Sequence, residues 1–239
     1  MDAPLDDAGG ERHLGTDKAR HPGDQRTAEL DRTHDPSRVL ALSDGIFAIV
    51  LTLLVLDIHL PDLAGGQSLA DALTEIRPTF SAFVISFVLA SMYWVGHRDL
   101  FAMIRRTDRF LVWVNVLYLL PVCLLPFATS LLGRYALEPV ALRLYGLVLL
   151  AIAVMRVAIW LYATGRTYLL WQPPDERIRR VGLGVTMTPG VIVIVAIAFT
   201  AIAPLGSLLI YAALPVLYFL SITVLRSGRR RDREFSDFT

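Results

Sequence analysis

Long apolar segments separated by short polar connections dominate the chain from residue 38 onward. Each segment approaches the roughly 20 residues that a helix needs to cross about 30 Å of hydrocarbon. The pattern therefore predicts an all-α membrane protein with six spanning helices, at 38–60, 79–97, 110–132, 140–163, 183–203 and 205–225. Only Ala203-Pro204-Leu205-Gly206 separates the last two segments, which predicts a helix break and a tight hairpin.

The two ends of the chain differ from this apolar region. Residues 1–36 carry mixed charge, Gly and Pro with almost no large apolar side chains, so they bury too little surface to offset chain entropy. We predict a disordered cytoplasmic tail at 1–36, a membrane domain at 37–226 and a basic cytoplasmic C-terminal tail at 227–239. The basic run directly follows a span, so it is interpreted as a topology anchor that meets anionic headgroups rather than as a nucleic-acid site.

Composition agrees with a membrane protein. The 239 residues are 54% hydrophobic, and their mean hydropathy is +0.52. The net charge of +1 gives no sign of a polyanionic partner, and the single cysteine, Cys123, excludes an intrachain disulfide. No His/Asp/Glu cluster has metal-ligand spacing, and no phosphate loop, nucleophile elbow or catalytic carboxylate pair occurs. We therefore expect no enzyme, no bound metal and no cofactor.

Arginines predict the sidedness of the spans. They gather before the first span, between the second and third, between the fourth and fifth, and after the sixth, whereas the alternate connections offer Arg77 and Arg134. Under the positive-inside rule both termini of this multi-pass cell-membrane protein are cytoplasmic. The connections 61–78 and 133–139 then face outward.

The first predicted helix carries ionisable groups at both ends, with Arg38 and Asp44 at one and Asp57 at the other. Such groups are expensive in hydrocarbon and seldom face lipid. Ser43 and Asp44 can form a plain N-cap. Alternatively, because Arg38 and Asp44 are too far apart for a pair on one helix, each seeks a partner on another helix.

The middle of this helix carries an apolar stripe. Ile49, Leu53 and Leu56 follow helical spacing and share one face, and Thr52 lies beside them. The stripe is either ordinary packing or, if several copies surround an axis, a hydrophobic constriction at which ion dehydration decides passage. In the second interpretation Asp57 attracts cations at the outer mouth.

The segment Arg38-x-x-x-Leu42-Ser43-Asp44 resembles the RxxxFSD signature of the potassium channels of the transmembrane protein 175 family. It departs from that signature only in having Leu42 where the family has Phe. Further matches follow in order: Trp94-x-x-His97 at the end of the second span, then Asn115 and the run 125–129, LPFAT, in the third. The resemblance covers about residues 36–225.

This resemblance implies a six-helix fold without a TVGYG-type filter, in which the first helix lines the pore of a homotetramer in the lipid bilayer. It assigns the constriction to Ile49, Leu53 and Leu56, and a contribution to selectivity to Thr52. The structural signature falls on Arg38, Ser43 and Asp44, against which Trp94 and His97 would pack or hydrogen-bond. Asn115 joins them as a polar group between helices.

Two functions follow as hypotheses. The first is a potassium-preferring cation channel, which needs no cofactor besides the permeant K⁺. The second is a proton- or ion-coupled secondary transporter that uses Asp44, His97 and Arg156. Arg156 lies in the middle of the fourth span, where it should find a carboxylate or a backbone carbonyl.

Overall fold

A computed structural model describes residues 35–63 and 68–236, with side chains up to Leu220; the predicted tail at 1–36 lies almost wholly outside these ranges. The unit that begins at Asp35 is helical. Its described part contains no β-strand, but it has one isolated antiparallel β-bridge between Ile104 and Leu170. The elements are α2 (Pro36–Leu53), η1 (Leu54–Asp57), α3 (Leu69–Glu75), α4 (Arg77–Phe101), α5 (Arg109–Cys123), α6 (Leu125–Arg134), α7 (Pro139–Gly165), η2 (Thr167–Leu169), α8 (Glu176–Phe199) and α9 (Pro204–Ser236).

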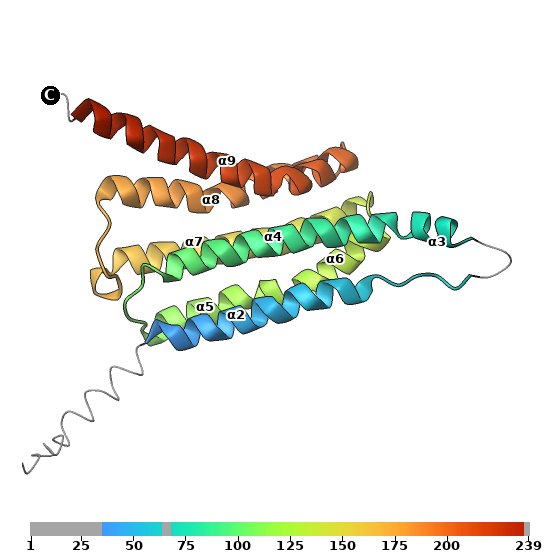
Figure 1. The fold of residues 1–239 in the computed structure, drawn as a ribbon, viewed down its shortest axis with the longest axis horizontal. Helices are drawn as coiled ribbons and strands as arrows, with labels where there is room; N and C mark the ends of the chain where they lie inside the picture. The colour runs from blue at the N-terminus through green and yellow to red at the C-terminus, as the bar shows by residue number, and fades with distance from the viewer. Residues whose placement is uncertain (1–34, 64–67, 237–239) are drawn as a thin grey trace, which may run out of the picture. The chain divides into compact units, whose positions relative to one another are not determined.

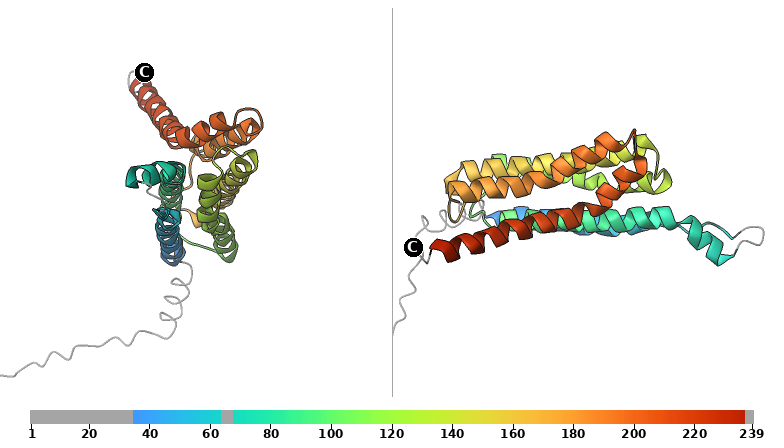
Figure 2. Two further views of the ribbon diagram at one scale, coloured as in Figure 1. Left: turned by 90° about the vertical axis from the view of Figure 1, so that its right-hand side faces the viewer. Right: turned by 90° about the horizontal axis from the view of Figure 1, so that it is seen from above.

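The long helices alternate in direction along the chain (Figure 1). Helix α2 packs against α4 and α5, whereas α7 packs against α5 and α8, and α8 against α9. The end-on view in Figure 2 accordingly places α2 at one edge of this bundle, with α8 and α9 at the other. Within the described part of the chain, one side of α2 is therefore left without a neighbouring helix.

The structure has a helix at each of the six predicted segments. Among the described residues, five helical segments are long and apolar enough to cross a membrane, and the apolar part of the sixth helix is Pro204–Leu220. The bounds differ from those predicted: the first segment ends at Asp57, the fifth begins at Glu176, and α9 continues as a helix to Ser236. The predicted hairpin is present, and Ser207 Oγ fastens it by donating to Ala196 O at 2.8 Å.

The third predicted segment forms one candidate span, Arg109–Arg134, but the helix is interrupted at Leu124, where α5 ends and α6 begins. Two prolines explain the break. Pro121 lies inside the last turn of α5 and has no N–H to donate, and Pro126 occupies the first turn of α6, where a missing N–H costs nothing. The Leu124 N–H donates to Pro121 O at 3.2 Å, and the Ala128 N–H donates to Leu124 O at 3.1 Å.

The connection 61–78, predicted as a loop, contains the short helix α3. Ser68 and Asp71 form a capping box, in which the Ser68 side chain accepts from the Asp71 N–H and the Asp71 carboxylate accepts from the Ser68 N–H. The hydrogen bonds from Ser68 hold the pKa of Asp71 below its ordinary value. The Ser-x-x-Asp spacing was the available signal for this helix start.

Glycines allow the closest approach of α7, α8 and α9. A methyl group on Gly146 of α7 would overlap the Tyr211 hydroxyl of α9 and the Ile197 side chain of α8. Tyr211 is fully buried and donates to Leu142 O at 3.1 Å. Small residues at such contacts let helices pack closely where no hydrophobic effect drives association in lipid.

We expect Gly146→Ala to lower the stability of the folded chain by about 1–3 kcal/mol, because the added methyl overpacks this contact. The matched control is Gly184→Ala on α8, where nothing lies within 4 Å of the added carbon. The control should be neutral or stabilising by up to about 1 kcal/mol, since Ala is the better helix former. The measurement is the thermal unfolding midpoint of both variants in detergent, and equal shifts would contradict the packing argument.

Candidate functional site

Helix α2 has one buried and one open face. The buried face carries Ser43, Phe47, Val50 and, in η1, Leu54. The stripe residues point elsewhere: the side chains of Ile49, Leu53 and Leu56 are 59%, 44% and 64% exposed. The stripe is thus not buried against the described part of the chain, and both interpretations of it, ordinary packing and a constriction, stay predictions.

The 3₁₀ turn η1 continues the stripe. Residues three apart eclipse one another in a 3₁₀ helix, so Leu56 stands above Leu53. Thr52 lies on the open side, and its hydroxyl donates to backbone oxygens of its own helix, at 2.8 Å to Ile49 O. The Thr52 oxygen keeps its acceptor capacity toward the outside of the bundle.

A chain of hydrogen bonds fixes the buried face. Asn115 on α5 donates from Nδ2 to Ser43 Oγ at 3.0 Å, and Ser43 Oγ donates onward to Val39 O at 3.0 Å. Asn115 Oδ1 lies 2.8 Å from His97 Nε2 on α4. All three side chains are buried, so each interhelical bond satisfies a group that water does not reach.

The chain also assigns the His97 tautomer. The Asn115 amide N–H donates to Ser43, so the Asn115 oxygen is the atom that faces His97 and it can only accept. Nε2 of His97 must therefore carry the proton of this hydrogen bond. The imidazole lies between the rings of Phe101 and Tyr118, with centroids at 4.5 and 5.0 Å. Its Nδ1 is buried and has no hydrogen-bond partner among the residues that the structure describes.

Asp44 is held separately. Trp94 on α4 donates from Nε1 to Asp44 Oδ1 at 2.7 Å, and the Arg98 guanidinium lies over the Trp94 ring at 6.0 Å. Asp44 is half-buried and has a partner on another helix rather than acting as an N-cap; the N-cap of α2 is Asp35. His97 reaches Ser43 through Asn115 and not directly, a link that the sequence motif did not reveal.

Two predicted residues are placed differently. Arg38 is exposed, and no hydrogen bond or ion pair joins it to another described residue, so its part in the interhelical network stays a prediction. Asp57 accepts from Ser130 Oγ at 3.0 Å and lies 3.6 Å from the Arg134 guanidinium. These α6 partners offset part of the Asp57 charge, and the attraction of cations by Asp57 also stays a prediction.

Arg156 is a polar centre whose partner the sequence did not reveal. Its side chain is 4% exposed, packs against the bare backbone of Gly96 on α4 and donates from Nη2 to the Tyr218 hydroxyl of α9 at 2.7 Å. This phenol takes the place of the expected carboxylate or carbonyl, and Nε and Nη1 of Arg156 have no hydrogen-bond partner among the described side chains. In the described part of the chain, no three His, Cys, Asp or Glu side chains gather where they could hold a metal ion.

Known proteins resemble this chain at the site and across the fold. The family model for the endosomal/lysosomal potassium channel TMEM175 matches residues 38–126. A potassium channel of Streptomyces collinus is 37% identical over 170 residues, which cover 66% of this chain and 82% of that protein. The endosomal/lysosomal proton channel TMEM175 of Homo sapiens is 34% identical over 138 residues, or 54% of this chain and 27% of that protein.

A solved structure agrees. The crystal structure of a lysosomal potassium-selective channel TMEM175 homolog from Chamaesiphon minutus superposes with a TM-score of 0.68 at 30% identity, covering 77% of this chain and 96% of that one. These relatives are ion channels and not enzymes. With a relative matched over most of its length and the signature residues gathered around α2, the chain belongs to the TMEM175 channel family.

Proposed function

We propose that the chain is one subunit of a potassium-preferring cation channel whose pore is lined by α2 and constricted by Ile49, Leu53 and Leu56. One observation carries the proposal: the stripe is exposed on α2, while polar contacts hold the opposite face of the same helix inside the bundle. The names of the relatives, potassium channels of two bacteria, support the choice of ion.

A single α2 cannot enclose a pore, so the proposal requires several copies. Closed cyclic symmetry is the usual arrangement of identical subunits, and a homotetramer brings four stripes around one axis. Isoleucine and leucine rings offer a passing ion no oxygen ligands, so the cost of dehydration limits the flux and favours the more weakly hydrated cation. Each stripe is then held toward the axis by the polar contacts on the opposite face of α2, made by Ser43, Asn115, His97, Asp44 and Trp94.

The distribution of charge supports both termini being cytoplasmic. One end of the bundle carries Arg38, Arg98, Arg105, Arg106, Arg109, Arg166, Arg177, Arg179 and Arg180, and the other carries Arg77, Arg134 and Arg143. Excess arginine in short connections stays on the cytoplasmic side. In this orientation Asp57 lies at the outer mouth, and the cell membrane is the site of action.

The channel proposal predicts passive potassium flux. In liposomes that contain the purified chain and a potassium gradient, we expect downhill flux that stops when the membrane potential balances the gradient and resumes with a proton ionophore. The read-outs are a voltage-sensitive dye and a potassium indicator. Flux that requires a second ion gradient would instead support the coupled transporter. Because the human relative is named a proton channel, the current is also measured with protons as the only permeant cation. A proton current equal to the potassium current would contradict the preference for potassium.

Ile49→Ala should raise unitary conductance and weaken the preference for potassium over sodium, because a smaller ring reduces dehydration. A barrier lower by about 1 kcal/mol corresponds to about fivefold higher conductance. The control is Ile194→Ala on α8, which makes the same change at an exposed position (54%) of a helix at the opposite edge of the bundle from α2 (Figure 2). Single-channel recording in planar bilayers compares the two. If both variants keep the wild-type conductance and selectivity, Ile49 is not part of the constriction.

Ser43→Ala tests the polar contacts that hold α2. The substitution removes the oxygen that accepts from the Asn115 amide. It should lower the free energy of unfolding by about 1 kcal/mol, within the range measured for hydrogen bonds between membrane helices. Ser91→Ala on α4 is matched, since Ser91 donates only to Phe87 O of its own helix at 2.8 Å. We expect a lower unfolding midpoint and less stable channel openings for Ser43→Ala alone. Identical behaviour of the two variants would show that the Asn115 bond does not hold the pore helix.

A further inference from the structure

The apolar stripe crosses a change of helix type. Helix α2 ends at Leu53, and the next four residues form the 3₁₀ turn η1. Within that turn Leu54 is buried, whereas Leu56 is exposed and stands above Leu53. A 3₁₀ helix has poorer hydrogen-bond geometry than an α-helix and is used in short pieces. The place of Leu56 therefore depends on what holds η1, and not only on the rotation of α2 that Ser43 sets.

Asp57, the last residue of η1, is tied to α6. Helix α6 lies over the η1 end of α2 (Figure 1). Ser130 Oγ donates to Asp57 Oδ1 at 3.0 Å, and the Arg134 guanidinium lies 3.6 Å from the same oxygen. Because the Arg134 side chain is largely exposed, water screens its ion pair, and the partly buried hydrogen bond from Ser130 is the stronger tie.

A second group of buried polar side chains fixes α6 in turn. Thr129 Oγ1 donates to Ser86 Oγ on α4 at 2.8 Å, and Ser86 Oγ lies 2.9 Å from the Tyr145 hydroxyl on α7. All three side chains are buried, so these contacts satisfy polar groups that water does not reach. Ser130 is the next residue after Thr129, and the contacts therefore keep Ser130 beside η1.

Different helices thus hold the two ends of α2. At the arginine-rich end Ser43 accepts from Asn115 of α5, and at the η1 end Asp57 accepts from Ser130 of α6. The interruption of the helix at Leu124 separates the segment of Asn115 from the segment of Ser130. A change at one anchor therefore leaves the other anchor in place.

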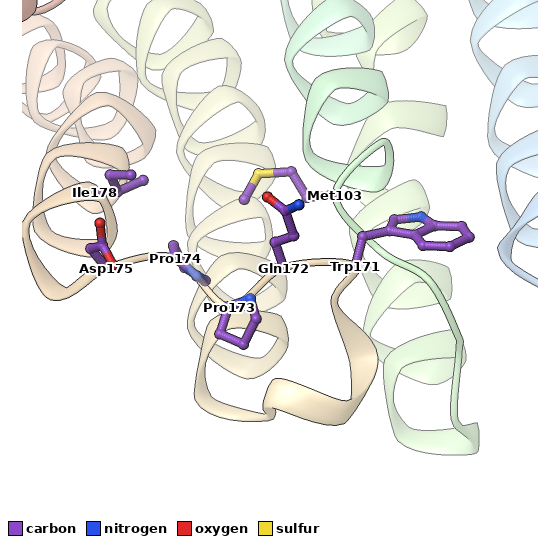
Figure 3. Close-up of a pocket in the computed structure, with 7 residues that line it drawn as sticks. All are labelled: Met103, Trp171, Gln172, Pro173, Pro174, Asp175 and Ile178. Atoms are coloured by element: carbon purple, nitrogen blue, oxygen red, sulfur yellow. The ribbon is translucent and has the colours of Figure 1, made fainter.

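Helix α4, which carries partners of α2 at the arginine-rich end, also has backbone support there. The Trp171 N–H donates to Met103 O at 3.1 Å, and the Arg105 N–H donates to Leu169 O at 2.7 Å. These bonds join the connection after α4 to the connection before α8, and Figure 3 shows Met103 and Trp171 in the lining of a hollow beside them. At the η1 end side chains hold the turn instead, so a single substitution there can release it.

We propose that Ser130 is a positioning residue for the pore, which acts through Asp57 to hold η1 so that Leu56 stands above Leu53. The inference rests on the proposed function, because that function gives Leu56 a place in the constriction. Ser130 itself lies on α6, outside the stripe, and its effect on a passing ion is indirect.

Loss of the Ser130 hydroxyl leaves Asp57 with the screened ion pair to Arg134, and the turn relaxes. The ring of Leu56 side chains then closes less tightly around the axis. Ile49 lies in α2, on the other side of the change of helix type, and keeps its place. The expected effect is therefore confined to one end of the stripe.

The first measurement is independent of ion flux. The single cysteine, Cys123, is replaced by alanine, and a nitroxide spin label is attached to Val55→Cys in η1 or to Ala48→Cys in α2, both exposed positions outside the stripe. In the electron paramagnetic resonance spectrum we expect Ser130→Ala to raise the mobility of the label at position 55 and to leave the label at position 48 unchanged. Ser130→Thr, which keeps the hydroxyl, should restore the original spectrum.

The second measurement is a double-mutant cycle on unitary conductance in planar bilayers. We expect Ser130→Ala to raise conductance about twofold, less than Ile49→Ala does, because no side chain leaves the pore. In a Leu56→Ala background Ser130→Ala should have no further effect, since the ring on which it acts is gone. In an Ile49→Ala background it should keep its effect. A general loss of stability would instead act equally in both backgrounds and would contradict the positioning role.

The control is Ser91→Ala, which removes a hydroxyl that donates to Phe87 O of its own helix and should change neither measurement. Arg134→Gln removes the ion pair and should act weakly. Equal effects of Arg134→Gln and Ser130→Ala would overturn the role of Ser130, as would an unchanged spectrum at position 55. Absence of potassium flux through the unaltered chain would contradict the channel proposal instead, and the spectra would still decide whether Ser130 holds η1.

Discussion

The arrangement of this protein depends on the rule that polar groups inside a membrane helix must find partners within the protein. Ser43 meets that rule by turning toward Asn115. At 100° per residue of α-helix, Ile49 is then turned about 120° away from Ser43, and Leu53, with Leu56 above it in the 3₁₀ turn, about 80° away. One buried hydrogen bond thus decides which apolar side chains leave the bundle. The polar signature and the apolar stripe are two consequences of a single helix rotation.

One turn of α4 connects this rotation to the rest of the chain. Trp94 binds Asp44 of α2, and His97 binds Asn115 of α5. Between them Gly96 leaves room for the Arg156 guanidinium of α7, which binds Tyr218 of α9. A methyl group at position 96 would overlap the Arg156 guanidinium, so the end of this arginine side chain would have to move. Among the described side chains no carboxylate contacts the buried arginine, which meets the hydroxyl and the ring face of Tyr218 and the bare backbone of Gly96.

Much of the fold could be predicted because apolar length is a strong signal, whereas helix ends and breaks are not. The first turns of α8 are rich in arginine, so hydropathy could not show that the helix already begins at Glu176. The sequence motif identified the members of the polar group, but it did not show which member bonds to which. These members are Ser43, Asp44, Trp94, His97 and Asn115. The pairs Arg156–Tyr218 and Asp57–Ser130 are 62 and 73 residues apart in the chain, and no local pattern joins such positions.

The surroundings of Asp57 bear on where selectivity can arise. The Asp57 carboxylate forms an ion pair with the largely exposed Arg134 guanidinium and accepts a hydrogen bond from the Ser130 hydroxyl. Such a pair attracts cations weakly and with little regard to their size, because water still separates ion and carboxylate and screens both. In the proposed pore the stripe would act differently, since an apolar ring removes hydration and the cost differs between cations. In the proposed pore, Asp57 would affect how often a cation arrives, and Ile49, Leu53 and Leu56 would affect which cation passes.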